Sequence, residues 1–232
     1  MLFSIFTPSG IHVTKDQLHQ YEQFLDLFIE KNKQINLSAI REEKDIVIKH
    51  FIDSLSITSL PQYQQAKNIV DIGSGGGFPG IPLAIYSPEK KFLLNESIEK
   101  KVLSIKYFIQ ELGLSNAKTS SLRAEELGHV PTEREQYDIC IARAVAYLPT
   151  LAEYCLPMVK IGGYFIAYKD NNQDEIQEAE NTIILLGGTL EKIHFYHLPE
   201  VEKERILIII KKEKETPKEY PRRVGVPSKK PL

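Results

Sequence analysis

Apolar residues in the first part of the chain recur every three or four positions, the period of an amphipathic helix. The stripe consists of Leu18, Tyr21, Leu25 and Phe28, with Phe24 beside it. Thr14 followed three residues later by Gln17 has the pattern of a capping box, which starts this helix just after Thr14. A second apolar pattern of the same kind covers about residues 42–57. We therefore predict an N-terminal helical appendage over residues 1–60.

Beyond residue 60 the helical period gives way to short apolar runs. The polar segment PQYQQ at 61–65 is typical of a linker. Five runs then predict buried strands, namely NIVDIG at 68–73, KFLLNE at 91–96, NAKTSS at 116–121, YDICIARA at 137–144 and GGYFIAYK at 162–169. Helical patterns lie between or after them, at about 98–112, 149–160 and 173–186.

This alternation of strands and helices predicts an α/β domain over residues 61–216. It is typical of a mostly parallel sheet with helices on both faces. Two last apolar runs, at 190–197 and 204–212, can form an antiparallel hairpin at the edge, which makes the sheet seven-stranded. Ligands of such sheets bind beyond the carboxyl ends of the strands. The glycine-rich segment after the first strand lies at that end.

The segment DIGSGGGFPG, residues 71–80, allows three interpretations. A P-loop requires Lys and Ser or Thr after the last glycine, but Ile81 and Pro82 stand there. A dinucleotide pattern G-x-G-x-x-G fits, but Pro79 and Pro82 would remove donors from the helix end that has to cradle a pyrophosphate. In the third register, D-x-G-x-G-x-G, an acid comes first at Asp71.

The acidic register favours a ligand with positive charge. Asp71 adds negative charge beside the loop, which is unhelpful for phosphates and suits an ammonium and a sulfonium group. Glu96 ends the second strand, where a carboxylate can accept hydrogen bonds from both ribose hydroxyls of an adenosine. The two acids and the glycine loop together predict S-adenosylmethionine as the cofactor.

Overall charge gives no argument for nucleic-acid binding, because the net charge is −2. The last thirteen residues, YPRRVGVPSKKPL, nevertheless carry four positive charges and no acidic side chain. Two interpretations of a basic tail over residues 217–232 stay open. It is either a solvated tail or a segment that follows the phosphates of a nucleic acid.

The remaining bulk features predict a protein of the cytoplasm without a membrane span. With 42% hydrophobic and 26% charged residues, the composition is ordinary for a globular protein, and no apolar run is long enough to cross a bilayer. Cys140 and Cys155 both lie in apolar surroundings, which is typical of core residues in a reducing compartment.

Two groups of polar residues contain the side-chain types of catalytic or metal sites, but neither has the arrangement that such a site needs. His50, Asp53 and Ser54 lie along one helical ridge, whereas a catalytic triad needs side chains that converge from different elements. We interpret them as a capping and interface network. The histidines at 194 and 197 lack the acidic or cysteine partners of a metal site, so no metal is predicted.

The continuation of the glycine segment, DIGSGGGFPGIPLAI, resembles the first motif of the bacterial small-subunit ribosomal RNA methyltransferase G family, also called the glucose-inhibited division protein B family. Further segments match in order, namely NLSAI (36–40), HFIDSL (50–55), ES-x-x-KK (96–101), ELGL (111–114), RAEEL (123–127), RAVA (143–146), LP-x-x-K-x-GG (156–163) and TPKEYPRRVGVPSKKPL (216–232). The resemblance covers about residues 14–232. One departure from the family pattern is Asn95, which stands where we expect an apolar residue.

The resemblance implies a class I methyltransferase with a Rossmann-like fold. It implies methylation of guanine N7 at one site in the decoding-region loop of 16S rRNA, with the free RNA or the small ribosomal subunit as substrate. We expect the protein to be a monomer. N7 carries a lone pair and no proton, so in-line methyl transfer needs no general base. An assembly factor that binds RNA without turnover and a nicotinamide-dependent dehydrogenase are the alternatives. The intact acidic motif argues against the first, and the prolines and Asp71 argue against the second.

The resemblance also implies roles for individual residues. With Asp71, the cofactor-binding set is Gly73, Ser74, Gly75, Phe78, the ribose ligand Glu96, the adenine neighbours Ala124 and Glu125, and Arg143. Arg143 is in addition the expected positioning residue for the methyl group or the incoming RNA. The candidate phosphate contacts are Lys100, Arg123, Lys169, Arg205, Arg222 and Arg223.

Overall fold

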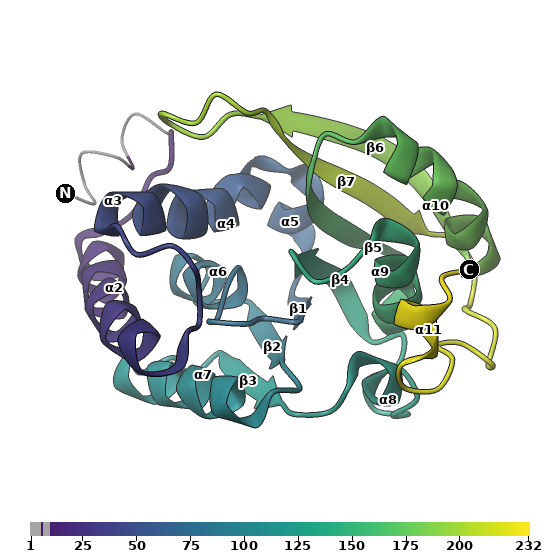
Figure 1. Ribbon diagram of the computed structural model, residues 1–232, viewed down its shortest axis with the longest axis horizontal. Coiled ribbons are helices and arrows are strands. Elements are labelled where there is room, and N and C mark those ends of the chain that lie inside the picture. Colours follow the sequence, from purple (N-terminus) through teal and green to yellow (C-terminus); the bar gives the residue numbers. More distant parts are fainter. Residues whose placement is uncertain (1–5, 7–9) are drawn as a thin grey trace.

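The structure, a computed structural model, describes residue 6 and residues 10–232 (Figure 1). Part of the predicted appendage, residues 1–5 and 7–9, lies outside the described residues. The described helices are α2 (Lys15–Ile35), α3 (Glu43–Ile46), α4 (Asp53–Leu55), α5 (Pro61–Gln65), α6 (Gly80–Tyr86), α7 (Glu99–Glu111), α8 (Ala124–Leu127), α9 (Leu148–Cys155), α10 (Gln173–Leu185) and α11 (Val226–Lys229). The strands are β1 (Asn68–Ile72), β2 (Lys91–Asn95), β3 (Ala117–Ser120), β4 (Tyr137–Arg143), β5 (Val159–Asp170), β6 (Gly188–Tyr196) and β7 (Arg205–Lys212).

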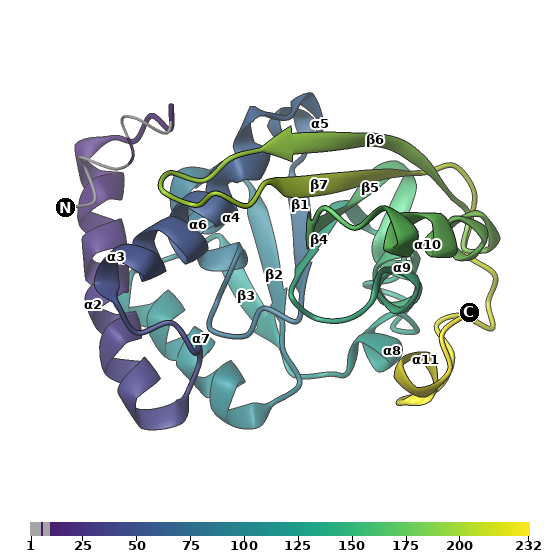
Figure 2. The same cartoon turned by 45° about the horizontal axis from the view of Figure 1, so that its top comes forward.

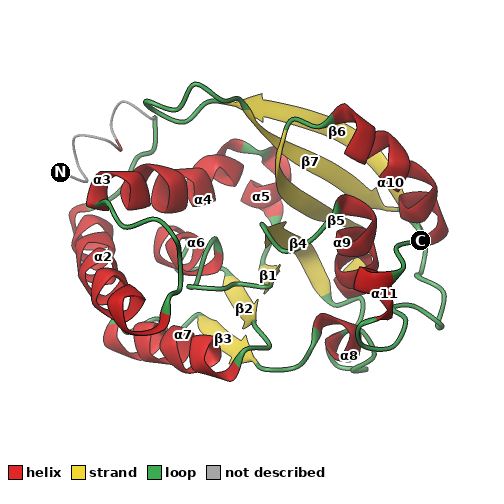
Figure 3. Ribbon diagram, in the orientation of Figure 1, coloured by secondary structure: helices red, strands yellow, loops and turns green. Residues whose placement is uncertain are grey.

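The strands form one seven-stranded sheet in the order β3-β2-β1-β4-β5-β7-β6 (Figure 3). Strands β1 to β5 pair in parallel, and β7 pairs antiparallel with both β5 and β6. The predicted fold class, with its antiparallel edge hairpin, is thereby confirmed. The order reverses between β1 and β4, and ligands of open α/β sheets bind in the crevice at such a reversal.

Each face of the sheet is covered by its own group of helices. Side chains alternate along a strand, so Ile69 packs into one hydrophobic cluster and its neighbour Val70 into the other. The first cluster includes residues of α2, α6 and α7, and the second includes residues of α9 and α10. Figure 2 shows the same division, with α2 to α7 on one side and α8 to α11 on the other.

The N-terminal helices are packed into the first cluster. Thr14 and Gln17 form the predicted capping box of α2, with Thr14 Oγ1 accepting from Gln17 N–H at 3.2 Å. A π-helical stretch, Val47–Ile52, joins α3 to α4, so the second predicted helix is continuous. Phe24 and Phe51, one from each helix, have ring centroids 5.3 Å apart. The division at residue 60 stays a prediction.

The predicted linker at 61–65 was wrong, because this segment is helix α5. Pro61 stands at its first position, where the missing N–H costs no hydrogen bond. Tyr63 is only 2% exposed and its hydroxyl donates to Ser87 Oγ at 2.9 Å. The mostly polar composition of this segment gave no indication that Tyr63 is buried. No helix in the described part of the chain is long and apolar enough to cross a membrane.

Candidate functional site

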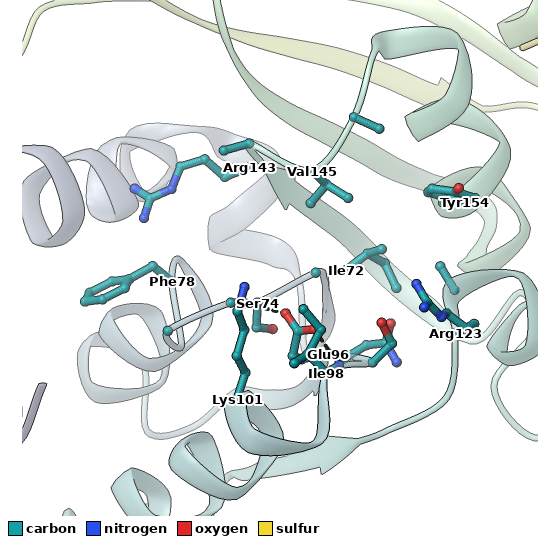
Figure 4. A pocket seen from close by; sticks show the side chains of 18 of the residues that line it. Ile72, Ser74, Phe78, Glu96, Ile98, Lys101, Arg123, Arg143, Val145 and Tyr154 are labelled. Carbon is teal, nitrogen blue, oxygen red and sulfur yellow. Dashed lines mark hydrogen bonds between the residues drawn. The ribbon is translucent and has the colours of Figure 1, made fainter. Parts of the chain in front are cut away.

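A cavity of about 670 Å³ opens at the carboxyl ends of β1, β2, β3 and β4 (Figure 4). In-register pairing brings these ends together, since Ile72 faces Asn95 on one side and Ala142 on the other. Nine of the predicted residues line the cavity, namely Gly73, Ser74, Gly75, Phe78, Glu96, Arg123, Ala124, Glu125 and Arg143. The volume suits a small-molecule ligand.

The glycine loop forms the floor of this cavity. The N–H groups of Gly73 and Ser74 donate to the carbonyl oxygen of Asn95 at 2.8 and 2.9 Å. Gly73 has φ +73°, and a Cβ there would lie 2.5 Å from a methyl carbon of Val145. Glycine is therefore required both by the left-handed backbone and by close packing against the loop that follows β4.

Glu96 joins the glycine loop to the segment after β2. Its Oε2 accepts from Gly75 N–H at 3.0 Å, and its Oε1 accepts from Ile98 N–H at 2.8 Å. The side chain is 7% exposed and lines the cavity. The preceding Asn95 replaces the expected apolar residue because its carboxamide donates to the Leu122 carbonyl at 2.9 Å, which ties β2 to the loop after β3.

Asp71 lies behind the glycine loop and does not line the cavity. It is 1% exposed, and its Oδ2 accepts from Gly80 N–H at 2.9 Å, which fixes the start of α6. Burial raises the pKa of Asp71 to about 7, although Ser74 and Gly80 oppose this through hydrogen bonds. The sequence predicts Asp71 as a cofactor-binding residue that adds negative charge beside the loop. The structure instead makes it a support of the loop.

Phe78 dominates one end of the cavity (Figure 4). The His50 ring stacks on it at 4.8 Å between centroids, and the Arg143 guanidinium carbon lies 5.7 Å from the centroid of Phe78. His50 Nε2 lies 2.8 Å from Ser38 Oγ. Burial, followed by the nearby Arg143 charge, lowers the pKa of His50 to about 3. The imidazole at this end is therefore neutral near pH 7.

Arg143 is held by a buried ion pair across the domain. Its Nη1 lies 2.6 Å from Asp53 Oδ2, and the two side chains are 12% and 3% exposed. Tyr196 donates its hydroxyl to the other Asp53 oxygen at 2.7 Å, and Tyr168 donates to the Ser54 carbonyl at 2.7 Å. The predicted interface role of Asp53 and Ser54 is thus confirmed, and the network includes Arg143. The predicted capping role was wrong, because among the residues that the structure describes no side chain caps α4 or the helical stretches next to it.

The opposite end of the cavity is formed by Arg123, Tyr154 and the segment after β3 (Figure 4). Glu125 is 5% exposed, and its Oε1 accepts from Gly225 N–H at 2.9 Å. Burial first, and the Glu125 charge next, raises the pKa of Tyr154 to about 12. The C-terminal segment therefore contributes to this wall.

The structure separates the six candidate phosphate contacts into two groups. Three are paired internally, namely Lys169 with Glu175, Arg205 with Asp170 and Arg222 with Glu153. The partners of Lys169 and Arg222 are buried carboxylates, so the geometry does not support a phosphate role for these two residues. The Arg205 pair is exposed and weak, so its phosphate role stays a prediction. No ion pair of Lys100, Arg123 or Arg223 is found within the described part of the chain. Of these three, only Arg123 lines the cavity.

Several lining residues were missed at the sequence level. They include Ser38, His50, Ile98, Val145, Tyr154, Val224 and Ser228. His50 belongs to a segment already noted, but its contact with Phe78 depends on how α4 docks. Tyr154 carries no sequence signal, because an aromatic residue in an apolar helix is normally a core residue. In the described residues, no cluster of three or more His, Cys, Asp or Glu is placed to hold a metal.

Sequence comparison gives a consistent set of relatives. Residues 17–207 match the model of the family described as rRNA small subunit methyltransferase G. A protein named ribosomal RNA small subunit methyltransferase G from Alkaliphilus metalliredigens is 44% identical over 224 residues, which is 96% of this chain and 94% of the relative. One of the same name from Lachnoclostridium phytofermentans is 46% identical over 224 residues, covering 96% and 93%.

Solved structures resemble the fold at low sequence identity. NSun6 from Pyrococcus horikoshii has a TM-score of 0.54 at 12% identity, covering 70% of this chain and 51% of that one. An O-methyltransferase family protein from Burkholderia thailandensis has a TM-score of 0.53 at 11% identity, covering 70% and 56%. These similarities confirm the predicted Rossmann-like fold. The family match over residues 17–207 and the relatives at 44–46% identity show that the chain belongs to the rRNA small subunit methyltransferase G family.

Proposed function

We propose that this protein methylates N7 of a single guanosine in the decoding-region loop of 16S rRNA, by in-line transfer without a general base. The methyl donor is S-adenosylmethionine. The observation that carries the proposal is the cavity itself, in which the glycine loop, Glu96 and Arg143 of an rRNA methyltransferase family member meet at the sheet reversal.

The described residues fit an adenosine-containing donor. Glu96 and Glu125 are carboxylates in the lining, and carboxylates accept hydrogen bonds from ribose hydroxyls and from an exocyclic amine. The glycine loop allows a ligand to approach its backbone closely. Glu96 would hold the ribose, Ala124 and Glu125 the adenine, and Gly73, Ser74, Gly75 and Phe78 the methionine end.

The acceptor side of the reaction is assigned to the Phe78 end. S-adenosylmethionine supplies a methyl group on a sulfonium, which is already activated for displacement. Phe78 and the His50 ring stacked on it make this end of the cavity aromatic and apolar, which would keep water away from a base turned out of its RNA loop. Arg143, whose charge is compensated by Asp53, provides positioned guanidinium N–H donors beside it.

The same geometry supports a mechanism without a general base. Guanine N7 has no proton to remove, so the site needs orientation rather than proton transfer. His50 is a poor base at this end, because burial lowers its pKa to about 3 and its Nε2 already lies 2.8 Å from Ser38 Oγ. Arg143 has only N–H donors and no acceptor, so it is not a base either.

A basic strip near the cavity is the proposed approach for RNA. Three predicted contacts have no ion pair within the described part of the chain, so their charge is available to RNA phosphates, namely Lys100, Arg123 and Arg223. Lys100 is at the start of α7, next to the lining residue Lys101. Cations at the mouth would neutralise phosphates while the target base enters the cavity.

The decisive experiment is chemical mapping of N7-methylguanosine in 16S rRNA. Borohydride reduction and aniline cleavage should cut at one decoding-region guanosine in RNA from cells that contain the protein, and not in RNA from cells that lack it. Re-expression of the wild-type chain should restore the cut. Persistence of the cut without the protein contradicts the proposal. Tight rRNA binding without any donor binding would favour the assembly-factor alternative.

A further inference from the structure

The C-terminal segment is folded against the domain by a buried ion pair. Glu153 of α9 is fully buried. Its carboxylate accepts hydrogen bonds from three N–H groups of Arg222, the backbone N at 2.7 Å, Nε at 2.9 Å and Nη2 at 2.6 Å. Arg134 donates to the carbonyls of Thr216 and Tyr220, at 2.7 and 2.8 Å. A bidentate pair of this kind fixes orientation as well as charge.

The residues that follow Arg222 reach the cavity. Val224, Gly225 and Ser228 belong to its lining. Gly225 has φ +79°, the left-handed backbone of a residue that turns the chain, and its N–H donates to Glu125 at 2.9 Å. Thr150 holds the next turn, because its hydroxyl donates to the Pro227 carbonyl at 3.1 Å. Figure 1 likewise places α11 beside α8 and α9.

We propose that residues 222–228 are part of the methyl-donor site, as the wall of its adenine end, with the Glu153–Arg222 pair as the latch that positions them. The proposal rests on the donor orientation given under the proposed function and is independent of which nucleotide is methylated. It replaces the interpretation of Arg222 as an RNA contact.

Charge and linkage support a donor role for this segment. The Arg222 guanidinium is occupied by a carboxylate, so it has no net charge to offer to a phosphate. Glu125 is shared, since it lines the adenine end and also accepts the Gly225 N–H. A ligand that binds the docked form of the segment more tightly stabilises docking, and docking in turn raises the affinity for that ligand by the same factor.

The first test places a charge in the proposed wall. Val224 is 48% exposed, so Val224→Asp should fold normally while setting a carboxylate against the adenine and Glu125. We expect the Kd for S-adenosylhomocysteine, measured by calorimetry, to rise about tenfold. Ile184→Asp is the matched control, because Ile184 is an apolar residue 60% exposed on α10. Equal affinity of both variants and wild type would overturn the proposal.

The second test uses backbone strain rather than charge. Gly225→Ala should raise the Kd for S-adenosylhomocysteine about fivefold, because the left-handed conformation is costly for alanine and the wall must shift to relieve it. Gly162→Ala is the control, since Gly162 has φ +82° and, like Gly225, nothing within 4 Å of an added Cβ. A Kd that rises equally in both variants, or in neither, counts against the wall.

Hydrogen exchange on the unmodified full-length protein closes the experiment. Saturating S-adenosylhomocysteine should slow exchange of the backbone amides of residues 222–226 and 228 by at least about tenfold. Unchanged exchange there, with calorimetry showing saturation, refutes the donor-site wall but leaves the proposed function intact. Absence of donor binding by the wild-type chain would instead refute the proposed function.

Discussion

Arg143→Ala probes whether this arginine acts on the substrate or only on the fold. The substitution leaves Asp53, which is 3% exposed, without the guanidinium that now lies 2.6 Å from its Oδ2. Breaking a buried pair by removing one partner costs about 3–5 kcal/mol. Tyr196 still donates to Oδ1 at 2.7 Å, so we expect the lower end of that range, about 3 kcal/mol.

Urea denaturation measures this cost, and single-turnover methylation of 16S rRNA measures function. We expect turnover of Arg143→Ala to fall about 100-fold, the size of the loss when a reacting group is misplaced by about 1 Å. The two effects are separated by the double variant Asp53→Asn, Arg143→Ala. It removes the unpaired charge and should recover at least half of the lost stability, while turnover stays low.

Two results would refute this reasoning. A loss of less than about 1 kcal/mol in Arg143→Ala would show that the pair is effectively solvated and contributes little. Recovery of turnover in the double variant would show that Arg143 serves only to neutralise Asp53. In that case the positioning role is wrong, and the site must orient the base by Phe78 and His50 alone.

Three further outcomes are expected. Glu96→Gln should weaken S-adenosylhomocysteine binding by about 1–3 kcal/mol in calorimetry, because the amide nitrogen that replaces one carboxylate oxygen cannot accept a hydrogen bond from a ribose hydroxyl; unchanged affinity would remove the ribose assignment. In the folded protein the pKa of His50 is lowered to about 3, whereas in the unfolded chain it is about 6.5. Between these two values only the unfolded chain binds a proton at this residue, so the free energy of unfolding falls as the pH falls below about 6.5. The stability advantage of wild type over His50→Gln in urea should therefore shrink by about 2 kcal/mol from pH 7.5 to pH 5, and a constant difference would contradict a buried neutral imidazole. Lys100→Ala should reduce the salt slope of rRNA binding by about 0.7–0.9, whereas Lys106→Ala, further along α7, should leave the slope unchanged. Equal slopes in the two variants would mean that the RNA binds elsewhere.

The sequence by itself determined the fold and the location of the site. Apolar runs that end in glycine or acid specify parallel strands and put Gly73 and Glu96 at the same edge, because pairing in register aligns the carboxyl ends. Local patterns were equally informative at Thr14, whose capping box needs only residues three positions apart. Such signals depend on near neighbours, so no tertiary information was needed.

Only the tertiary structure decided which charges act and which are compensated. Arg222 and Arg223 are adjacent and chemically identical, yet only Arg222 meets the buried Glu153, which is 69 residues away in sequence. Asp71, predicted to bind the cofactor, instead supports the glycine loop. Burial raises its pKa, and its Oδ2 accepts a hydrogen bond from Gly80 N–H. The energy of an ionised group depends on its partners and its solvent, and both are set by how distant segments pack.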